Sequence, residues 1–141
     1  MKALAALAVS LLLSTGWSAS AQNRVNDKDI QIMMNNIKSD SGRFRTAFNN
    51  SVKKTTIRHT SREKNSKNLV ANFKARVDGM YRTFKSTKKA DTALPLVIDT
   101  ASQIDKFKEI SFDEATNASW AKVKTELKQL ADAYGVQDTM T

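Results

Sequence analysis

The chain has 141 residues, with 23 Lys and Arg, 14 Asp and Glu, no Cys and a net charge of +9. The absence of Cys excludes thiol catalysis, cysteine-bound zinc, iron–sulfur clusters and thioether-linked haem. The length suits one ordinary domain, and a chain of this size can hold a single core without disulfides.

The first 21 residues differ from the rest of the chain. Lys2 gives a positive start, an apolar run follows over residues 3–13, and Ala19 and Ala21 are the small residues that signal peptidase accepts. The apolar run is shorter than the roughly 20 residues of a membrane-spanning helix. We expect a signal peptide at residues 1–21, cleaved after Ala21, and therefore a secreted or periplasmic protein. The alternative is an uncleaved anchor.

The remaining chain, residues 22–141, is expected to be one domain without a transmembrane segment. Its charge is uneven. Residues 22–90 contain 17 basic and 5 acidic residues, a net charge of +12, whereas residues 91–141 contain 5 basic and 9 acidic residues, a net charge of −4. This asymmetry indicates either an anionic partner for the first half or charge pairing between the two halves.

The first predicted helix covers residues 27–55. Asn26 is its expected N-cap, because a side-chain oxygen can accept a hydrogen bond from a free backbone N–H of the first turn. Asp27 and Asp29 follow at the positive end of the helix dipole. Apolar residues recur at helical spacing and predict a buried face made of Ile30, Met33, Ile37, Phe44, Phe48 and Val52, with Ser41 in one position.

A connection is expected over residues 55–61, where the apolar period is lost and hydroxyl residues gather. Thr60 or Ser61 then caps a second helix, which is predicted to end near Lys89. Lysines in its last turn suit the negative end of the dipole. Its predicted buried face consists of Val70, Phe73, Val77, Met80 and Phe84.

Asp91 or Thr92 opens a third predicted helix, with Pro95 in the first turn, where a missing N–H costs little. Its buried face is predicted to contain Leu94, Val97, Ile98, Ala101, Ile104 and Phe107. A short turn at residues 111–113 leads to a fourth helix, which Gly135 is expected to end in a left-handed conformation. That helix is predicted to bury Trp120, Val123, Leu127, Leu130 and Tyr134.

Four amphipathic helices with short links predict an all-α fold, an antiparallel up-down-up-down four-helix bundle. The first two helices are the longest, about thirty residues or roughly 40–45 Å each, so the first hairpin is expected to project beyond the second. We name its end, residues 53–67, the basic tip. It contains one acid, Glu63, and the seven candidate anion-binding residues Lys53, Lys54, Arg58, His59, Arg62, Lys64 and Lys67.

The first predicted helix starts within the run VNDKDI at residues 25–30 and continues through Arg43, Phe44 and Phe48. The later part of the chain contains IDKF at residues 104–107, then Trp120, Leu127, Leu130, Ala131, Tyr134 and Val136. These motifs resemble a family of uncharacterised secreted bacterial helical-bundle proteins over most of residues 22–141. The resemblance implies an exported helical domain and carries no known activity. Members often end with a Trp-containing tail, which this chain lacks.

His59 is the single histidine of the sequence. A hydrolytic triad needs a nucleophile, a base and an orienting acid, and no nucleophile elbow accompanies His59. Glu63 lies four residues later, but a di-iron bundle needs two Glu-x-x-His pairs and two further glutamates. The second histidine of a di-iron site is missing, so we predict no metal site. Because the usual catalytic constellations are missing too, we predict that the protein is not an enzyme.

Haem binding and glycoside hydrolysis are two further chemistries whose candidate residues also suit structural roles. A noncovalent haem held by His59 would need a methionine as its second ligand, but methionines at helical spacing usually fill a core; the candidates are Met33, Met34 and Met80. Asp113 with Glu114, and Asp105 with Glu109, are paired carboxylates, whereas a glycosidase pair lines a cleft. Their positions at a helix start and on one helix face suit dipole and solvation roles. No cofactor is expected.

Two functions of different classes remain. In the first, the basic tip contacts an anionic envelope polymer or lipid head groups by charge. No aromatic residue lies between Lys53 and Lys67, so neither base stacking nor a nucleic-acid partner is indicated. In the second, the protein is structural or stress-related, chaperone-like or dimerising, and acts through apolar helix surfaces. The alternative for the basic tip is that it binds no partner and is only a solvated charged surface.

Overall fold

The structure, a computed structural model, describes residues 25–107 and 112–140. Within these residues the chain forms four helices and no strand: α1 (Asp27–Val52), α2 (Ser61–Thr87), α3 (Ala93–Asp105) and α4 (Glu114–Tyr134). The predicted all-α fold with four helices is therefore confirmed for this part of the chain. The expected signal peptide, residues 1–21, lies outside the described residues.

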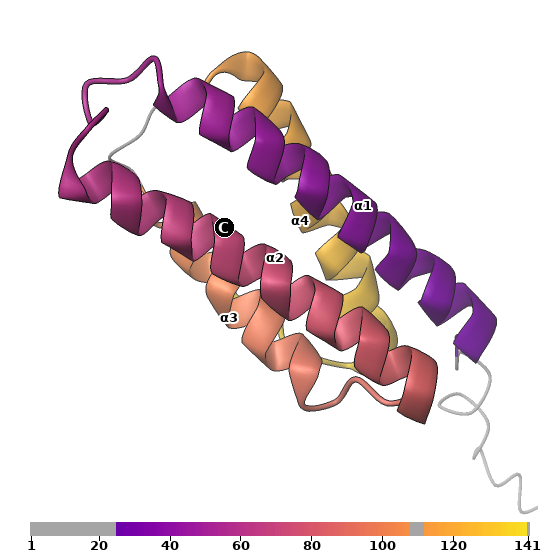
Figure 1. The fold of residues 1–141 in the computed structure, drawn as a ribbon. Coiled ribbons are helices and arrows are strands. Elements are labelled where there is room, and N and C mark those ends of the chain that lie inside the picture. The colour runs from indigo at the N-terminus through magenta and orange to yellow at the C-terminus, as the bar shows by residue number, and fades with distance from the viewer. Residues whose placement is uncertain (1–24, 108–111, 141) are drawn as a thin grey trace, which may run out of the picture.

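The four helices pack side by side around a shared core (Figure 1). α1 packs against α2 and α4, and α2 also packs against α3, whereas α3 and α4 touch only slightly. α1 and α2 contain 26 and 27 residues, and α3 and α4 contain 13 and 21. The longest helices are thus the first two, as the apolar pattern predicts.

The end of α1 lies level with the start of α4. The backbone N–H of Asp113 donates to Ser51 Oγ over 3.4 Å, which joins the residue before α4 to the last turn of α1. Turns at Lys54 and Thr55 close α1 a few residues before its predicted end. α1 itself therefore does not project beyond the start of α4, and the first hairpin continues past this level only with the residues that follow Val52.

Local capping explains where the helices begin and end. Asn26 Oδ1 accepts from the N–H of Asp29 over 2.9 Å, and Thr60 Oγ1 accepts from the N–H of Glu63 over 3.4 Å. These two predicted N-caps are confirmed. Gly135 ends α4 with φ of 63°, the left-handed conformation that a glycine adopts without steric cost.

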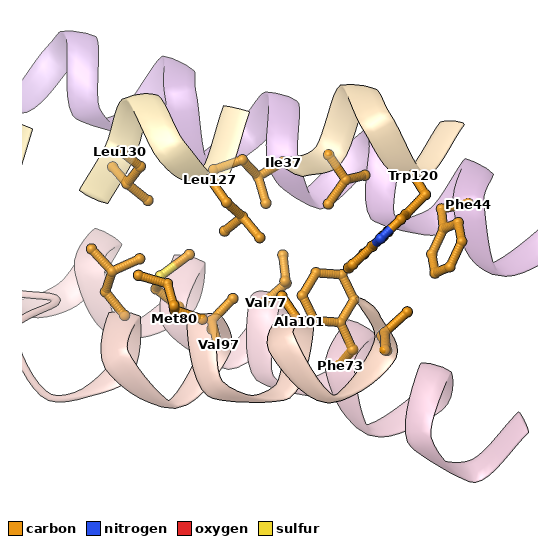
Figure 2. Packing of buried hydrophobic residues seen from close by; sticks show 14 of the residues in the cluster. Ile37, Phe44, Phe73, Val77, Met80, Val97, Ala101, Trp120, Leu127 and Leu130 are labelled. Carbon is orange, nitrogen blue, oxygen red and sulfur yellow. The ribbon is translucent and has the colours of Figure 1, made fainter. Parts of the chain in front are cut away.

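Aromatic and aliphatic side chains from all four helices meet in one core. Phe44, Phe73 and Trp120 converge there from α1, α2 and α4 (Figure 2). The Trp120 ring centroid lies 4.7 Å from that of Phe44 and 5.4 Å from that of Phe73. Contacts between aromatic rings at such distances stabilise a core beyond the burial of their area.

The predicted buried faces are confirmed except at three positions. In α1 the buried methionine is Met34, and Met33 is half-buried. The buried face runs from Ile30 through Met34, Ile37, Ser41 and Phe44 in alternating steps of four and three residues, which keeps one face towards neighbouring helices. Outside α1, the two predicted residues that are half-buried instead lie at or beyond helix ends: Phe107 and Tyr134.

Candidate anion-binding surface

Ile57 holds the centre of the basic tip against the bundle. Its side chain is 6% exposed and belongs to the hydrophobic core. Turns close the chain on both sides of it, with the N–H of Thr55 donating to the carbonyl of Val52 and the N–H of Thr60 donating to the carbonyl of Ile57. The loop between α1 and α2 is therefore anchored to the bundle by the buried side chain of Ile57 and by two turns.

The structure brings the seven predicted residues together at one end of the molecule (Figure 1). Two follow α1, two lie in the loop, and three lie in the first two turns of α2. Six are exposed and one is half-buried. The exposed residues are Lys53, Lys54, Arg58, His59, Arg62 and Lys64; the half-buried residue is Lys67.

Glu63, the one acid of the basic tip, is engaged by its neighbours. Its Oε2 accepts the backbone N–H of His59 over 2.5 Å, and its Oε1 accepts from Lys67 Nζ. These hydrogen bonds hold the pKa of Glu63 below its usual range. Glu63 therefore compensates the charge of Lys67 and braces the loop through the backbone N–H of His59.

Asp113 brings a second carboxylate to this end of the bundle. It is the N-cap of α4, and its Oδ1 accepts from the N–H of Thr116 over 2.9 Å. Its pKa is lowered mainly by its hydrogen bonds with Thr116, and the charge of Lys54 contributes. Asp113 therefore caps α4, and its charge also interacts with that of Lys54.

The described salt bridges do not pair Lys53, Lys54, Arg58 or Lys64 of the basic tip with acids of the second half of the chain. Lys67 pairs with Glu63 and Lys74 pairs with Asp78, both within α2. The described ion pair that links the halves brings a further cation, Lys122 of α4, to Asp40 of α1. Among the described residues, salt-bridge partners are missing for Lys53, Lys54, Arg58 and Lys64.

A second ionic cluster, which the sequence did not indicate, lies where α1 meets α4. Asp40 is 5% exposed. Its Oδ1 accepts from Arg43 Nη1 and its Oδ2 pairs with Lys122 Nζ, each over 2.9 Å. Glu126 completes the cluster from the next turn of α4. We name these four residues the Asp40 cluster.

The two carboxyl groups of the Asp40 cluster have different pKa values. Burial, a hydrogen bond to Asp40 and the charge of Asp40 raise the pKa of Glu126 to about 7. Asp40 is desolvated too, but Lys122, Glu126 and Arg43 outweigh that burial and hold its pKa below the usual value. Below about pH 7 the shared proton therefore resides on Glu126 and not on Asp40, and the buried Oε2 of Glu126 has no other hydrogen-bond partner among the described residues.

The other candidate chemistries have ordinary structural roles where they are described. Asp105 accepts from Trp120 Nε1 over 3.0 Å and from Lys124 Nζ over 2.9 Å, while its predicted partner Glu109 lies outside the described residues. Met34 and Met80 are buried in the core. Within the described parts of the chain, no three His, Asp or Glu side chains form a group that could hold a metal ion.

Comparison with known proteins adds no assignment. No family model matches the chain, and no significant match is found among curated proteins or solved structures. No helix in the described part of the chain combines the length and the apolar character needed to cross a bilayer.

Proposed function

We propose that this chain is an exported, non-enzymatic helical-bundle protein whose basic tip binds an anionic component of the cell envelope. The proposal includes a signal peptide cleaved after Ala21, a secreted or periplasmic location, up-down-up-down helix order, and the resemblance to secreted bacterial helical proteins. The observation that carries it is a set of four exposed bases without described salt-bridge partners: Lys53, Lys54, Arg58 and Lys64.

Electrostatics supports this function for the tip. A cluster of cations attracts polyanions with little selectivity for their detailed structure and with strong dependence on salt. Because Ile57 and Glu63 brace the loop, its bases lose little backbone freedom when an anion binds. No aromatic residue lies among them, so the proposed ligand is a phosphate- or sulfate-bearing polymer or lipid head group.

Exposed apolar surface gives less support to the alternative, a chaperone-like or dimerising protein. The exposed large hydrophobic side chains of the described residues are Ile32, 51% exposed, and Leu96, 53% exposed. They lie on different helices, α1 and α3. A protein that captures apolar clients presents a contiguous patch of several hundred Å². Separate single residues favour the anion-binding function.

Binding of the processed chain, residues 22–141, to soluble lipopolysaccharide and to a sulfated polysaccharide tests the tip. We expect binding at about 0.05 M salt that is lost at about 0.5 M salt. Reversing two tip charges, Lys53→Glu with Lys64→Glu, should weaken binding about thirty-fold or more, since a basic residue near an anionic surface contributes about 1 kcal/mol.

The control reverses two bases outside the tip, Arg82→Glu with Lys128→Glu, and changes the net charge equally. We expect it to weaken binding less than about three-fold, because screening limits distant charges. Equal losses of affinity in the two variants would show that net charge alone attracts the ligand, and would refute the basic tip as the binding site. Association that persists at high salt would instead favour the apolar alternative.

A further inference from the structure

A second basic surface lies at the other end of the α1–α2 hairpin. There a hollow of about 500 Å³ opens between the two helices. It is lined by one acid, Asp27, and by Lys28, Gln31, Ile32, Asn35, Tyr81 and Lys88. We name it the Tyr81 groove. It begins at the first turn of α1, roughly 35–40 Å along that helix from the basic tip.

Residue spacing explains why these side chains share one surface. Lys28, Ile32 and Asn35 follow steps of four and three residues on α1, while Tyr81 lies on α2 and Lys88 is the left-handed residue that caps the C-terminal end of α2. Such steps place side chains on one face of a helix. The α1 row therefore lies beside Tyr81 and the C-terminal end of α2, and these side chains line one hollow.

Lysines from both helices converge on the aromatic ring of this groove. Lys38 Nζ lies 4.9 Å from the Tyr81 ring centroid, and Lys85 Nζ lies 5.7 Å from it. Lys28 and Lys88 line the groove together with Tyr81, against one acid in the lining, Asp27, and Lys88 Nζ lies 5.6 Å from the ring centroid of Phe84. Cation–π contacts orient ammonium groups without neutralising them, so the groove keeps a positive field.

Ile32 distinguishes this groove from the basic tip. Its side chain is 51% exposed and lies in the lining beside the lysines. A soluble polyanion gains little from an apolar side chain, whereas an interfacial surface uses both kinds of contact: cations meet lipid phosphates while apolar groups enter the acyl boundary. The pairing of exposed isoleucine with four lysines therefore matches a bilayer.

We propose that the Tyr81 groove docks on the surface of an anionic lipid bilayer, with its lysines on head-group phosphates and Ile32 in the interfacial layer. This inference rests on the proposed function, binding of envelope anions, and names the class of partner. Lipid phosphates then meet both ends of the hairpin, and the α1–α2 side of the bundle faces the membrane.

Two matched reporters test the docking. After processing, the chain keeps one tryptophan, the buried Trp120, so a tryptophan at an exposed site reports on its own surroundings. We compare Ile32→Trp with Leu96→Trp, a site of equal exposure on α3. With phosphatidylglycerol vesicles, the fluorescence of Ile32→Trp should shift to the blue and that of Leu96→Trp should not. Phosphatidylcholine vesicles and a sulfated polysaccharide should shift neither.

Removing charge from the groove provides the second arm. Lys28→Gln with Lys88→Asn should weaken binding to phosphatidylglycerol vesicles about thirty-fold. Asparagine is chosen because Lys88 has φ of 58° and asparagine tolerates this left-handed conformation. Ile32→Asn should weaken vesicle binding roughly five-fold and leave polysaccharide binding unchanged. Leu96→Asn is its control.

The outcomes separate this inference from the proposed function. Vesicle binding without a blue shift at residue 32, or equal shifts at residues 32 and 96, would refute docking of the Tyr81 groove on the bilayer. If the tip variant Lys53→Glu with Lys64→Glu still loses polysaccharide binding, the proposed function survives that failure. If the fluorescence of Ile32→Trp shifts while the tip variant binds the polysaccharide normally, anion binding by the basic tip is refuted and membrane docking of the Tyr81 groove is supported. Absence of binding to either probe refutes both.

Discussion

The two long interfaces of α1, the α1–α4 seam and the α1–α2 seam, differ in where their charged side chains lie. Where α1 meets α4, Asp40 is nearly buried and holds Arg43 and Lys122, while Glu126 lies beside it. Where α1 meets α2, the interior is apolar, and Lys38 and Lys85 lie over the Tyr81 ring.

The difference indicates which charges are available to a ligand. At the α1–α4 seam the cations are committed to a buried carboxylate, so an external anion would have to compete with Asp40. At the α1–α2 seam and its tip, several cations have no such partner. The first seam therefore bears on stability and its pH dependence, and the second bears on binding.

The largest expected effect concerns the apolar interior that both seams share. Phe73→Ala removes a fully buried ring that contacts Trp120 and should lower the free energy of unfolding by about 3–5 kcal/mol. The loss should be the same at acidic and neutral pH, because no ionisable group is involved. Urea denaturation measures it, and Arg82→Ala on the exposed face of α2 is the control. A loss below about 1 kcal/mol would contradict the packing described here.

Glu126→Gln sharpens the comparison through pH. The pKa of Glu126 is about 7 when folded, against an ordinary value of 4.5. Because the folded value is raised, the stabilisation by this group is complete below about pH 4.5 and is lost as the pH rises through about 7. Glutamine keeps an N–H donor towards Asp40 and does not ionise. We expect the variant to be more stable than the parent by about 1–2 kcal/mol near pH 8, allowing for partial solvent exposure.

Denaturation at about pH 5 and about pH 8 checks this. Near pH 5 the variant and the parent protein should differ little, since Glu126 is then protonated. Asp132→Asn, on the exposed side of α4, is the matched control and should not change the pH profile. If the parent and Glu126→Gln lose stability in parallel between these pH values, the Asp40 cluster does not titrate as described.

The smallest effect concerns Gly79, inside α2. A Cβ built there meets no heavy atom within 4 Å, so alanine fits without strain. Gly79→Ala should raise the free energy of unfolding by about 0.5–1 kcal/mol, because glycine lowers helix propensity and widens the unfolded ensemble. Thermal melting measures the gain. A destabilised variant would show that α2 packs more closely at Gly79 than described, and Gly135→Ala, at positive φ, should be destabilising by contrast.

Sequence reasoning succeeded where the determining interactions are local. Asn26, Thr60 and Gly135 were identified as caps because each acts within one helical turn of itself. Most of the buried faces followed from periodicity alone. The choice of Met33 over its neighbour Met34 failed because a step of three and a step of four both fit a helix, and packing against other helices decides between them.

The charged surfaces also differ in whether their residues are neighbours in the sequence, and this decides whether the sequence predicts them. The seven basic residues of the tip are close in sequence, so their gathering at one end was predictable. The Asp40 cluster joins residues more than eighty positions apart, and no local pattern marks Asp40 as nearly buried or Lys122 as its partner. The Tyr81 groove likewise needs the register of α1 against α2 to bring Lys38 over the ring.

Amide chemical shifts of the processed chain, followed while a soluble sulfated polysaccharide is added at low salt, test the central claim most directly. We predict that the amides of residues 53–67 move first and saturate, and that those along the α1–α4 seam near Lys122 stay in place, because Asp40 already holds that cation. Shifts spread evenly over all four helices, or concentrated on α3 and α4, would contradict the account.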